Sequence, residues 1–236
     1  MSQTTLDDRS ATSTRAAEIV REYGPFPGAD RINGVTHDGR HVWAATGPRL
    51  VAFDPRSGEP ARTLECACDA GTAFDGKHLY QIAEARIDKI DPATGAVIAS
   101  IPAPGNGSDS GLAWAEGSLW VGEYRQRRIH QIDPATGEIR RRIQSNRFVT
   151  GVTWVDGELW HGTWEGEQSE LCRIDPDDGS VVERLEMPPG TGISGLESDG
   201  NELFYCGGGT SGKVRAVRRP KSAPSPQRLA EPGSTP

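Results

Sequence analysis

The sequence has no long apolar run. Hydrophobic residues make up 35% of the 236 residues, and residues 1–16 are rich in Ser, Thr and Asp. No segment has the apolar core of a signal peptide or the length of a membrane span. We therefore expect a cytoplasmic protein that begins with a disordered leader over residues 1–16. Residues 221–236 are rich in Pro and Ser, and we expect a disordered tail there.

Positive charge is also scarce. The net charge is −7, and no basic cluster is interleaved with aromatic residues. Affinity for nucleic acids depends on neutralising phosphates, so this balance argues against a nucleic-acid partner. The Arg-rich segments 125–128 and 140–142 alternate with acidic neighbours, and we interpret them as solvated surface.

The chain has four cysteines. In a cytoplasmic protein these are expected to be free thiols. Cys66 and Cys68 have the spacing of half a zinc site, but the second pair of ligands is missing. Cys68 and Cys206 both map to one end of the predicted fold, which leaves a soft-metal or redox site as the less favoured alternative. The sequence also lacks HExxH, a glycine-rich phosphate loop and a Ser-His-Asp order, so we predict neither a metal nor a cofactor.

Glycine and proline are abundant, at 29 and 17 residues, and they recur with a period of roughly 40 residues, the length of a four-stranded propeller blade. An aromatic residue repeats along the chain, as does a glycine about nine residues before it. An Asp-Pro-x-x-Gly turn also occurs four times, beginning at Asp54, Asp91, Asp133 and Asp175. The repeated positions are Trp43, Tyr80, Trp120, Trp160 and Phe204 for the aromatic, and Gly34, Gly71, Gly111, Gly151 and Gly195 for the glycine.

Each repeat predicts four short antiparallel strands. In the third repeat these cover residues 111–114, 119–122, 128–132 and 138–143, with the Asp-Pro turn before the last. Five repeats predict an all-β fold, a five-bladed β-propeller, as one domain over residues 17–220. The fifth repeat has only three strands. Residues 17–28 resemble the fourth-strand segment 181–190, so we predict that an N-terminal strand closes the ring.

One mouth of a propeller channel is built by the loops before the first strand and after the second strand of each blade. These loops carry acidic and aromatic residues here, and crowded carboxylates raise one another's pKa, which suits acid–base chemistry. We predict Asp69 and Glu123 as catalytic groups. The alternative for each residue is a solvated loop position or a group that accepts backbone N–H groups at a strand end, and a buried histidine between blades is the alternative for His161. The predicted ligand-binding residues are Asn33, Glu84, Asp109, Tyr124, His161, Trp164 and Glu165.

The segments Leu79-Tyr80-Gln81 and 155–160, followed by Trp164 and combined with the Ile-Asp-Pro turns, resemble the plant and bacterial type of glutamine cyclotransferase. The resemblance covers residues 17–219. It implies a five-bladed propeller that converts N-terminal glutaminyl residues to pyroglutamyl residues, with loss of ammonia and without a metal. In that chemistry the α-amine attacks the side-chain amide, and a carboxylate carries the proton to the leaving group.

The resemblance also assigns positions. The family's catalytic glutamate falls at Ala70, with Asp69 beside it, and Glu84 stands where the family has tryptophan, whereas Trp164 matches. At three other positions where the family's site has an amide side chain, this sequence has Asn33, Thr150 and Ser194.

Streptogramin lyases and gluconolactonase-like propellers share the blade pattern and use a divalent metal. Three functions therefore stay open. The first is a cyclotransferase-like enzyme acting on a small amine or a peptide N-terminus. The others are a non-catalytic propeller that binds a small ligand or protein, and a metal-dependent lyase or hydrolase. We expect a monomer.

Overall fold

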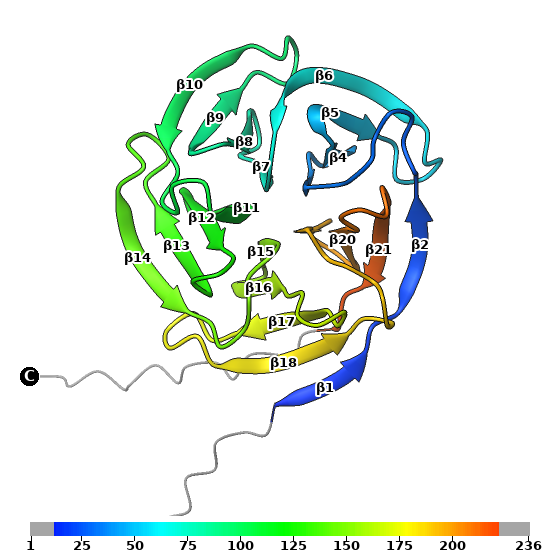
Figure 1. The fold of residues 1–236 in the computed structure, drawn as a ribbon, viewed down its shortest axis with the longest axis vertical. Coiled ribbons are helices and arrows are strands. Elements are labelled where there is room, and N and C mark those ends of the chain that lie inside the picture. The colour runs from blue at the N-terminus through cyan, green and yellow to red at the C-terminus, as the bar shows by residue number, and fades with distance from the viewer. Residues whose placement is uncertain (1–11, 222–236) are drawn as a thin grey trace, which may run out of the picture.

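The computed structural model describes residues 12–221, which form strands and turns with no helix. Five sheets are arranged around a central axis as the blades of a propeller (Figure 1). This confirms the predicted fold class, an all-β five-bladed β-propeller. No helix in this part of the chain could cross a membrane.

Three blades consist of four consecutive antiparallel strands, numbered from the axis outward. Blade 1 contains β3 (Gly34–His37), β4 (Val42–Ala45), β5 (Gly47–Phe53) and β6 (Pro60–Cys68). Blade 2 contains β7 (Thr72–Phe74), β8 (Leu79–Ala83), β9 (Arg86–Ile90) and β10 (Val97–Pro102). Blade 3 contains β11 (Asp109–Ala115), β12 (Ser118–Glu123), β13 (Arg128–Ile132) and β14 (Ile139–Gln144).

Blade 5 is completed by the N-terminal part of the chain, as predicted. Its own strands are β19 (Gly195–Ser198), β20 (Leu203–Gly207) and β21 (Val214–Arg218), and β2 (Ile19–Tyr23) pairs antiparallel with β21 as the outer strand. The ring of Tyr23 is buried, 4.8 Å from the ring of Phe53, and its hydroxyl donates to the carbonyl of Pro55 at 2.9 Å. Tyr23 therefore joins the closing strand of blade 5 to blade 1.

Blade 4 has a fifth strand, which corrects one expectation. It contains β15 (Val152–Val155), β16 (Glu158–Gly162), β17 (Glu170–Ile174) and β18 (Val181–Glu186), and β1 (Ser13–Ala16) pairs with β18 in parallel. The prediction of a disordered leader over residues 1–16 is therefore wrong for Ser13–Ala16. All four of these side chains are exposed and show no apolar pattern. The strand is held by backbone pairing on an otherwise open sheet edge and by an ion pair between Arg15 and Glu183 at 3.1 Å. Residues 1–11 and 222–236, where the remaining leader and the tail were predicted, lie outside the described residues.

The Asp-Pro turns join the third and outer strands. In blade 3 the amide of Gly137 donates to the carbonyl of Asp133 at 2.9 Å, and Gly137 has a φ of +78° that favours glycine. The carboxylate of Asp133 accepts the amides of Ala135 at 2.8 Å and Thr136 at 3.0 Å. Because all four turns have the same Gly-to-Asp hydrogen bond, the repeated sequence gives a repeated geometry.

The blades pack through the repeated aromatic residues. The aromatic ring in the second strand of blades 2, 3 and 4 packs on an aromatic ring of the following blade, within a buried cluster that spans both. The ring centroids are 5.6 Å apart for Tyr80 and Trp114, 4.8 Å for Trp120 and Trp154, and 5.1 Å for Trp160 and Phe204.

Tyr23→Ala should test closure by β2. The change removes a buried ring between two blades, and we expect it to lower the free energy of unfolding by about 3 kcal/mol or more. Val20 lies on the same strand and is 39% exposed, so Val20→Thr should change stability by no more than about 0.5 kcal/mol. Urea denaturation of both variants measures the difference, and equal effects would contradict closure through Tyr23.

Candidate functional site

A cavity of about 320 Å³ lies at one mouth of the propeller axis. Its lining comes from the loops before the first strands and after the second strands of the blades. The lining residues are Asn33, Asp69, Ala70, Asp109, Ser110, Tyr124, Thr150, Trp164, Ile193, Ser194 and Gly209.

Five of the nine predicted site residues line this cavity: Asn33, Asp69, Asp109, Tyr124 and Trp164. Glu84, Glu123, His161 and Glu165 do not. The sequence reasoning missed the small and apolar lining residues because it selected ionisable and aromatic side chains. The signal that could have found most of them was the position itself, since Ala70, Ser110, Thr150 and Ser194 each directly precede a repeated glycine.

Asp109 is the carboxylate best suited to proton transfer. It begins β11, is 9% exposed, and accepts the amide of Gly105 on Oδ1 at 2.8 Å. Its buried Oδ2 has no hydrogen-bond partner among the described residues. Burial raises the pKa of Asp109, and the amides of Gly105 and Gly107 offset this only in part. Asp109 therefore offers one free oxygen and an elevated pKa at the cavity wall.

Glu123 stands behind Asp109 and not in the cavity. It lies opposite Asp109 in the β11–β12 pairing, and its charge contributes to the raised pKa of Asp109. Its Oε2 is 3.0 Å from Nε2 of His130, which is 2% exposed, and its Oε1 accepts the hydroxyl of Ser108 at 3.4 Å. The placement makes Glu123 a supporting carboxylate for Asp109.

Asp69 lines the wall between blades 1 and 2 and is exposed. Its Oδ2 accepts the backbone amide of Glu84 at 2.9 Å. Glu84 has a φ of +53°, and its side chain is 81% exposed and 3.5 Å from the guanidinium of Arg86. Glu84 thus contributes its amide, which orients Asp69, while its carboxylate points away from the cavity.

Two aromatic residues form walls that hold each other. The ring of Trp164 lies flat on Gly192, where an added Cβ would come within 1.4 Å of the ring. The hydroxyl of Tyr124 donates to the carbonyl of Trp164 at 3.1 Å, which links the loops of blades 3 and 4. The ring of Tyr124 in turn packs on Phe148, with centroids 4.8 Å apart.

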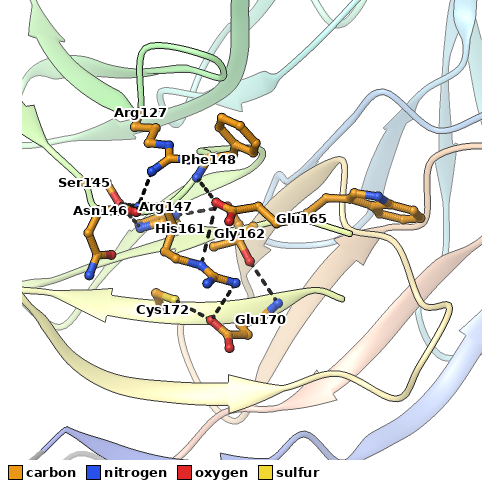
Figure 2. Close-up of polar contacts among 12 residues, drawn as sticks. Arg127, Ser145, Asn146, Arg147, Phe148, His161, Gly162, Glu165, Glu170 and Cys172 are labelled. Atoms are coloured by element: carbon orange, nitrogen blue, oxygen red, sulfur yellow. Dashed lines mark hydrogen bonds and ion pairs between the residues drawn. The ribbon is translucent and has the colours of Figure 1, made fainter. Parts of the chain in front are cut away.

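Glu165 belongs to a polar cluster beside these walls (Figure 2). Its Oε1 accepts the amide of Phe148 at 2.8 Å and lies 3.8 Å from Nε of Arg147. The guanidinium of Arg147 also lies 3.6 Å from Glu170, and that of Arg127 lies 4.5 Å above the ring of Phe148. Glu165 therefore holds the loop that supports the aromatic walls.

His161 is fully buried and belongs to the same cluster (Figure 2). Its Nδ1 is 3.0 Å from the carbonyl of Gly162, and its Nε2 is 3.1 Å from the hydroxyl of Ser145. Burial lowers the pKa of His161 to about 4. A neutral ring that donates from Nδ1 and accepts on Nε2 satisfies both contacts, so His161 is placed to join the blades.

A further carboxylate, which the sequence analysis did not select, lies on the inner strand of blade 5. Glu197 lies on β19 at a position where the other inner strands have Thr36, Ala73, Ala113 and Thr153. Its carboxylate accepts the hydroxyls of Thr36 at 2.9 Å and Thr153 at 2.6 Å, and the amide of Ser198 at 2.8 Å. Burial raises the pKa of Glu197 to about 7. The sequence did contain a signal for this residue, because Glu197 is the one charged residue at a repeat position that is otherwise Thr or Ala.

Within residues 12–221 no group of three or more His, Cys, Asp and Glu side chains is placed to hold a metal ion. All four cysteines are free. Cys68 and Cys206 are fully buried in different core clusters, and neither lines the cavity. The alternative of a metal site built from these two thiols therefore has no geometric support.

A family model described as outer membrane protein assembly factor BamB matches residues 83–223, more than half of the chain. The chain belongs to this family. No curated protein matches the chain.

Among solved structures, glutaminyl cyclase from Myxococcus xanthus matches with a TM-score of 0.74 and 18% identity over 88% of this chain and 98% of that one. The two proteins share the propeller fold. Virginiamycin B lyase from Staphylococcus aureus has a TM-score of 0.49 and 16% identity, covering 84% of this chain and 70% of that one. Kuenenia stuttgartiensis hydrazine synthase has a TM-score of 0.48 and 18% identity, covering 76% of this chain and 56% of that one.

Glu197→Gln should change how stability depends on pH. The folded-state pKa is raised from its ordinary value of 4.5 to about 7, so the associated stabilisation is complete below pH 4.5 and is lost as the pH rises through 7. Gln stays neutral and can donate to Thr36. We expect the variant to exceed the wild type by on the order of 2–3 kcal/mol at pH 8 and by little at pH 4.5. Denaturation across this range, with the exposed Glu59→Gln as control, measures the gap, and a gap independent of pH would reject the assignment.

Proposed function

We propose that the axial cavity binds a small ligand bearing a primary amine, such as a peptide N-terminus, and that the chain catalyses acyl transfer of the glutaminyl cyclase type. The observation that supports this proposal most directly is which residues line the cavity. It combines the carboxylates of Asp69 and Asp109 with the rings of Tyr124 and Trp164, and no Lys, Arg or His is among the described residues that line it. Carboxylates and aromatic faces attract an ammonium group, whereas an anion would meet like charge.

The proposed reaction is an intramolecular aminolysis. The bound ammonium group first loses a proton to water, because only the neutral amine has a lone pair. The α-amine nitrogen then attacks the carbonyl carbon of the side-chain amide, a new C–N bond forms, and the amide C–N bond breaks to release ammonia. One proton must move from the attacking amine to the leaving nitrogen. We assign this step to Asp109, because its Oδ2 is free and burial raises its pKa toward the working range of an acid–base group.

Asp69 would then orient the amine from the loop that leads into blade 2. Glu123, which the sequence suggested as a catalytic group, would tune Asp109 from behind. The cavity volume lies at the small end of the range for ligand sites, which suits a terminal residue or dipeptide end. The fold shared with a glutaminyl cyclase supports the same choice of chemistry.

The second candidate is a non-catalytic binding propeller. It is favoured by Ala70, which lines the cavity at the position where the resemblance places a catalytic glutamate. A methyl group carries no proton, so the cavity would bind the amine without turning it over. The description of the matched family as an assembly factor also fits a binding role.

Asp109→Asn tests the catalytic proposal. The change keeps the shape of the side chain and removes its ability to carry a proton. Ammonia release from a glutaminyl dipeptide should fall by about 10²–10⁴-fold in kcat. The exposed Glu138→Gln should retain full activity. No ammonia release by folded wild-type protein would reject the enzyme, and release that survives Asp109→Asn would reject Asp109 as the proton carrier.

A binding measurement tests the ligand class separately. By calorimetry, the glutaminyl dipeptide should bind at least about 10-fold more tightly than its N-acetylated form, which lacks the ammonium charge. Trp164→Ala should weaken binding of the free amine by a similar factor, whereas Trp164→Phe should retain most of it. Equal affinity for both forms of the dipeptide would contradict the amine site, whether or not the protein is an enzyme.

A further inference from the structure

Two of the four thiols meet at the end of β6. The Sγ atoms of Cys66 and Cys68 are 3.1 Å apart, and Sγ of Cys68 is also 3.1 Å from the carbonyl oxygen of Cys66. On a regular strand, residues two apart lie about 6.6 Å from each other along the chain, and their side chains run side by side. Proximity of the sulfurs therefore needs an irregular backbone.

A bulge in β6 supplies that irregularity. Arg49 pairs with Glu65 and Gly47 pairs with Cys68, so β6 contains one more residue than β5 between these pairs. A bulge bends its strand and redirects the side chains. Gly47 has a φ of +98°, which allows the partner strand to turn at the same point. The register of blade 1 thus brings the two thiols together.

The two thiols differ in reactivity. Cys66 is partly exposed, whereas Cys68 is fully buried. The contact between the two sulfur atoms lowers the pKa of Cys66, and the same contact together with burial raises the pKa of Cys68. Cys172 and Cys206 are buried, and burial raises the pKa of each to about 12. Cys66 is therefore the thiol that should react first with an oxidant.

We propose that Cys66 and Cys68 form a reversible redox-modification site next to two residues of the cavity wall, Asp69 and Ala70, and that a hydroperoxide oxidises it. The Cys66 thiolate attacks the O–O bond of the hydroperoxide, giving a sulfenic acid and releasing hydroxide or alkoxide. The sulfur of Cys68 then attacks Cys66. The S–S bond forms, the S–O bond breaks, and the thiol proton of Cys68 leaves with the hydroxyl as water. A dithiol reductant returns both thiols.

The position of the pair couples it to the cavity. Cys68 is followed by Asp69 and Ala70, which both line the wall, and its carbonyl accepts the side-chain amide of Asn33 at 2.8 Å. Asp69 in turn accepts the amide of Glu84. A disulfide would bring the two sulfur atoms from 3.1 Å to about 2.05 Å, which shifts the side chains at the end of β6 that carries these contacts. The redox site does not depend on the proposed function.

The first experiment treats the full, reduced chain with a small excess of hydrogen peroxide. We expect two of the four thiols to become unreactive and the mass to fall by about 2 Da, with one bridge mapped between Cys66 and Cys68 and reversed by dithiothreitol. Cys172 and Cys206 serve as internal controls that stay reduced. Cys68→Ser should stop the reaction at a sulfenic acid on Cys66, which dimedone traps. Retention of all four thiols, or a bridge between two copies of the chain, would overturn the proposal.

The second experiment measures coupling to the cavity. Hydrogen exchange at the amide of Glu84, which is bonded to Asp69, should change several-fold on oxidation and return on reduction, because its acceptor moves. Cys172→Ser should show the same change, and Cys66→Ser should show none. If the disulfide forms but hydrogen exchange at the Glu84 amide does not change, the proposed coupling between the thiol pair and the cavity wall is wrong.

Discussion

Direct backbone contact between the inner strands at the axis is the constraint on which the site depends. A Cβ added to Gly71 or Gly151 would lie 2.3 Å from a backbone nitrogen of the next blade, and on the three other repeated glycines it would come within 2.7 Å of a neighbouring backbone atom. Only glycine allows this approach. Each residue directly before one of these glycines consequently lines the cavity: Asn33, Ala70, Ser110, Thr150 and Ser194. The fold therefore determines five positions that line the cavity, one before each repeated glycine. The chemistry of the site depends on the side chains at these positions and in the surrounding loops.

The acidic groups have different environments because strand pairing separates them. Asp109 and Glu123 face each other across β11 and β12, but Glu123 contacts His130 and Ser108, whereas Asp109 keeps an oxygen without a partner among the described residues. Glu197 lies further down the axis with two threonine hydroxyls. Of these three carboxylates, Asp109 lines the cavity, Glu123 contributes its charge to the raised pKa of Asp109, and Glu197 is held by hydroxyl groups along the axis. The proposed function therefore assigns the proton transfer to Asp109.

The sequence predicted the fold well because each repeated residue meets a fixed physical requirement. Glycine is needed at the axis, an aromatic ring between blades, and Asp-Pro-x-x-Gly at the outer turn. β1 was missed because its exposed side chains have no apolar pattern, and backbone pairing and the ion pair between Arg15 and Glu183 hold the strand. The loops of the cavity were also predictable from blade register. The direction of individual side chains was not, because it depends on local backbone, as in Glu84 with its positive φ, or on neighbours distant in sequence, as between His161 and Ser145.

The two sides of the cavity are built differently, and this has a consequence for recognition. On the side of blades 3 and 4, Tyr124 and Trp164 are fixed by hydrogen bonding, by ring packing and by the cluster around Arg147. On the side of blades 1 and 2, Asp69 is exposed and follows a bulged strand end, with one amide hydrogen bond to its carboxylate. Under the proposed function, a ligand would therefore meet a preorganised aromatic wall and a more adjustable carboxylate. Since preorganised groups lose less entropy on binding, the aromatic side should set which ligands fit, and changes in β6 should act mainly through the strength of the contact at Asp69.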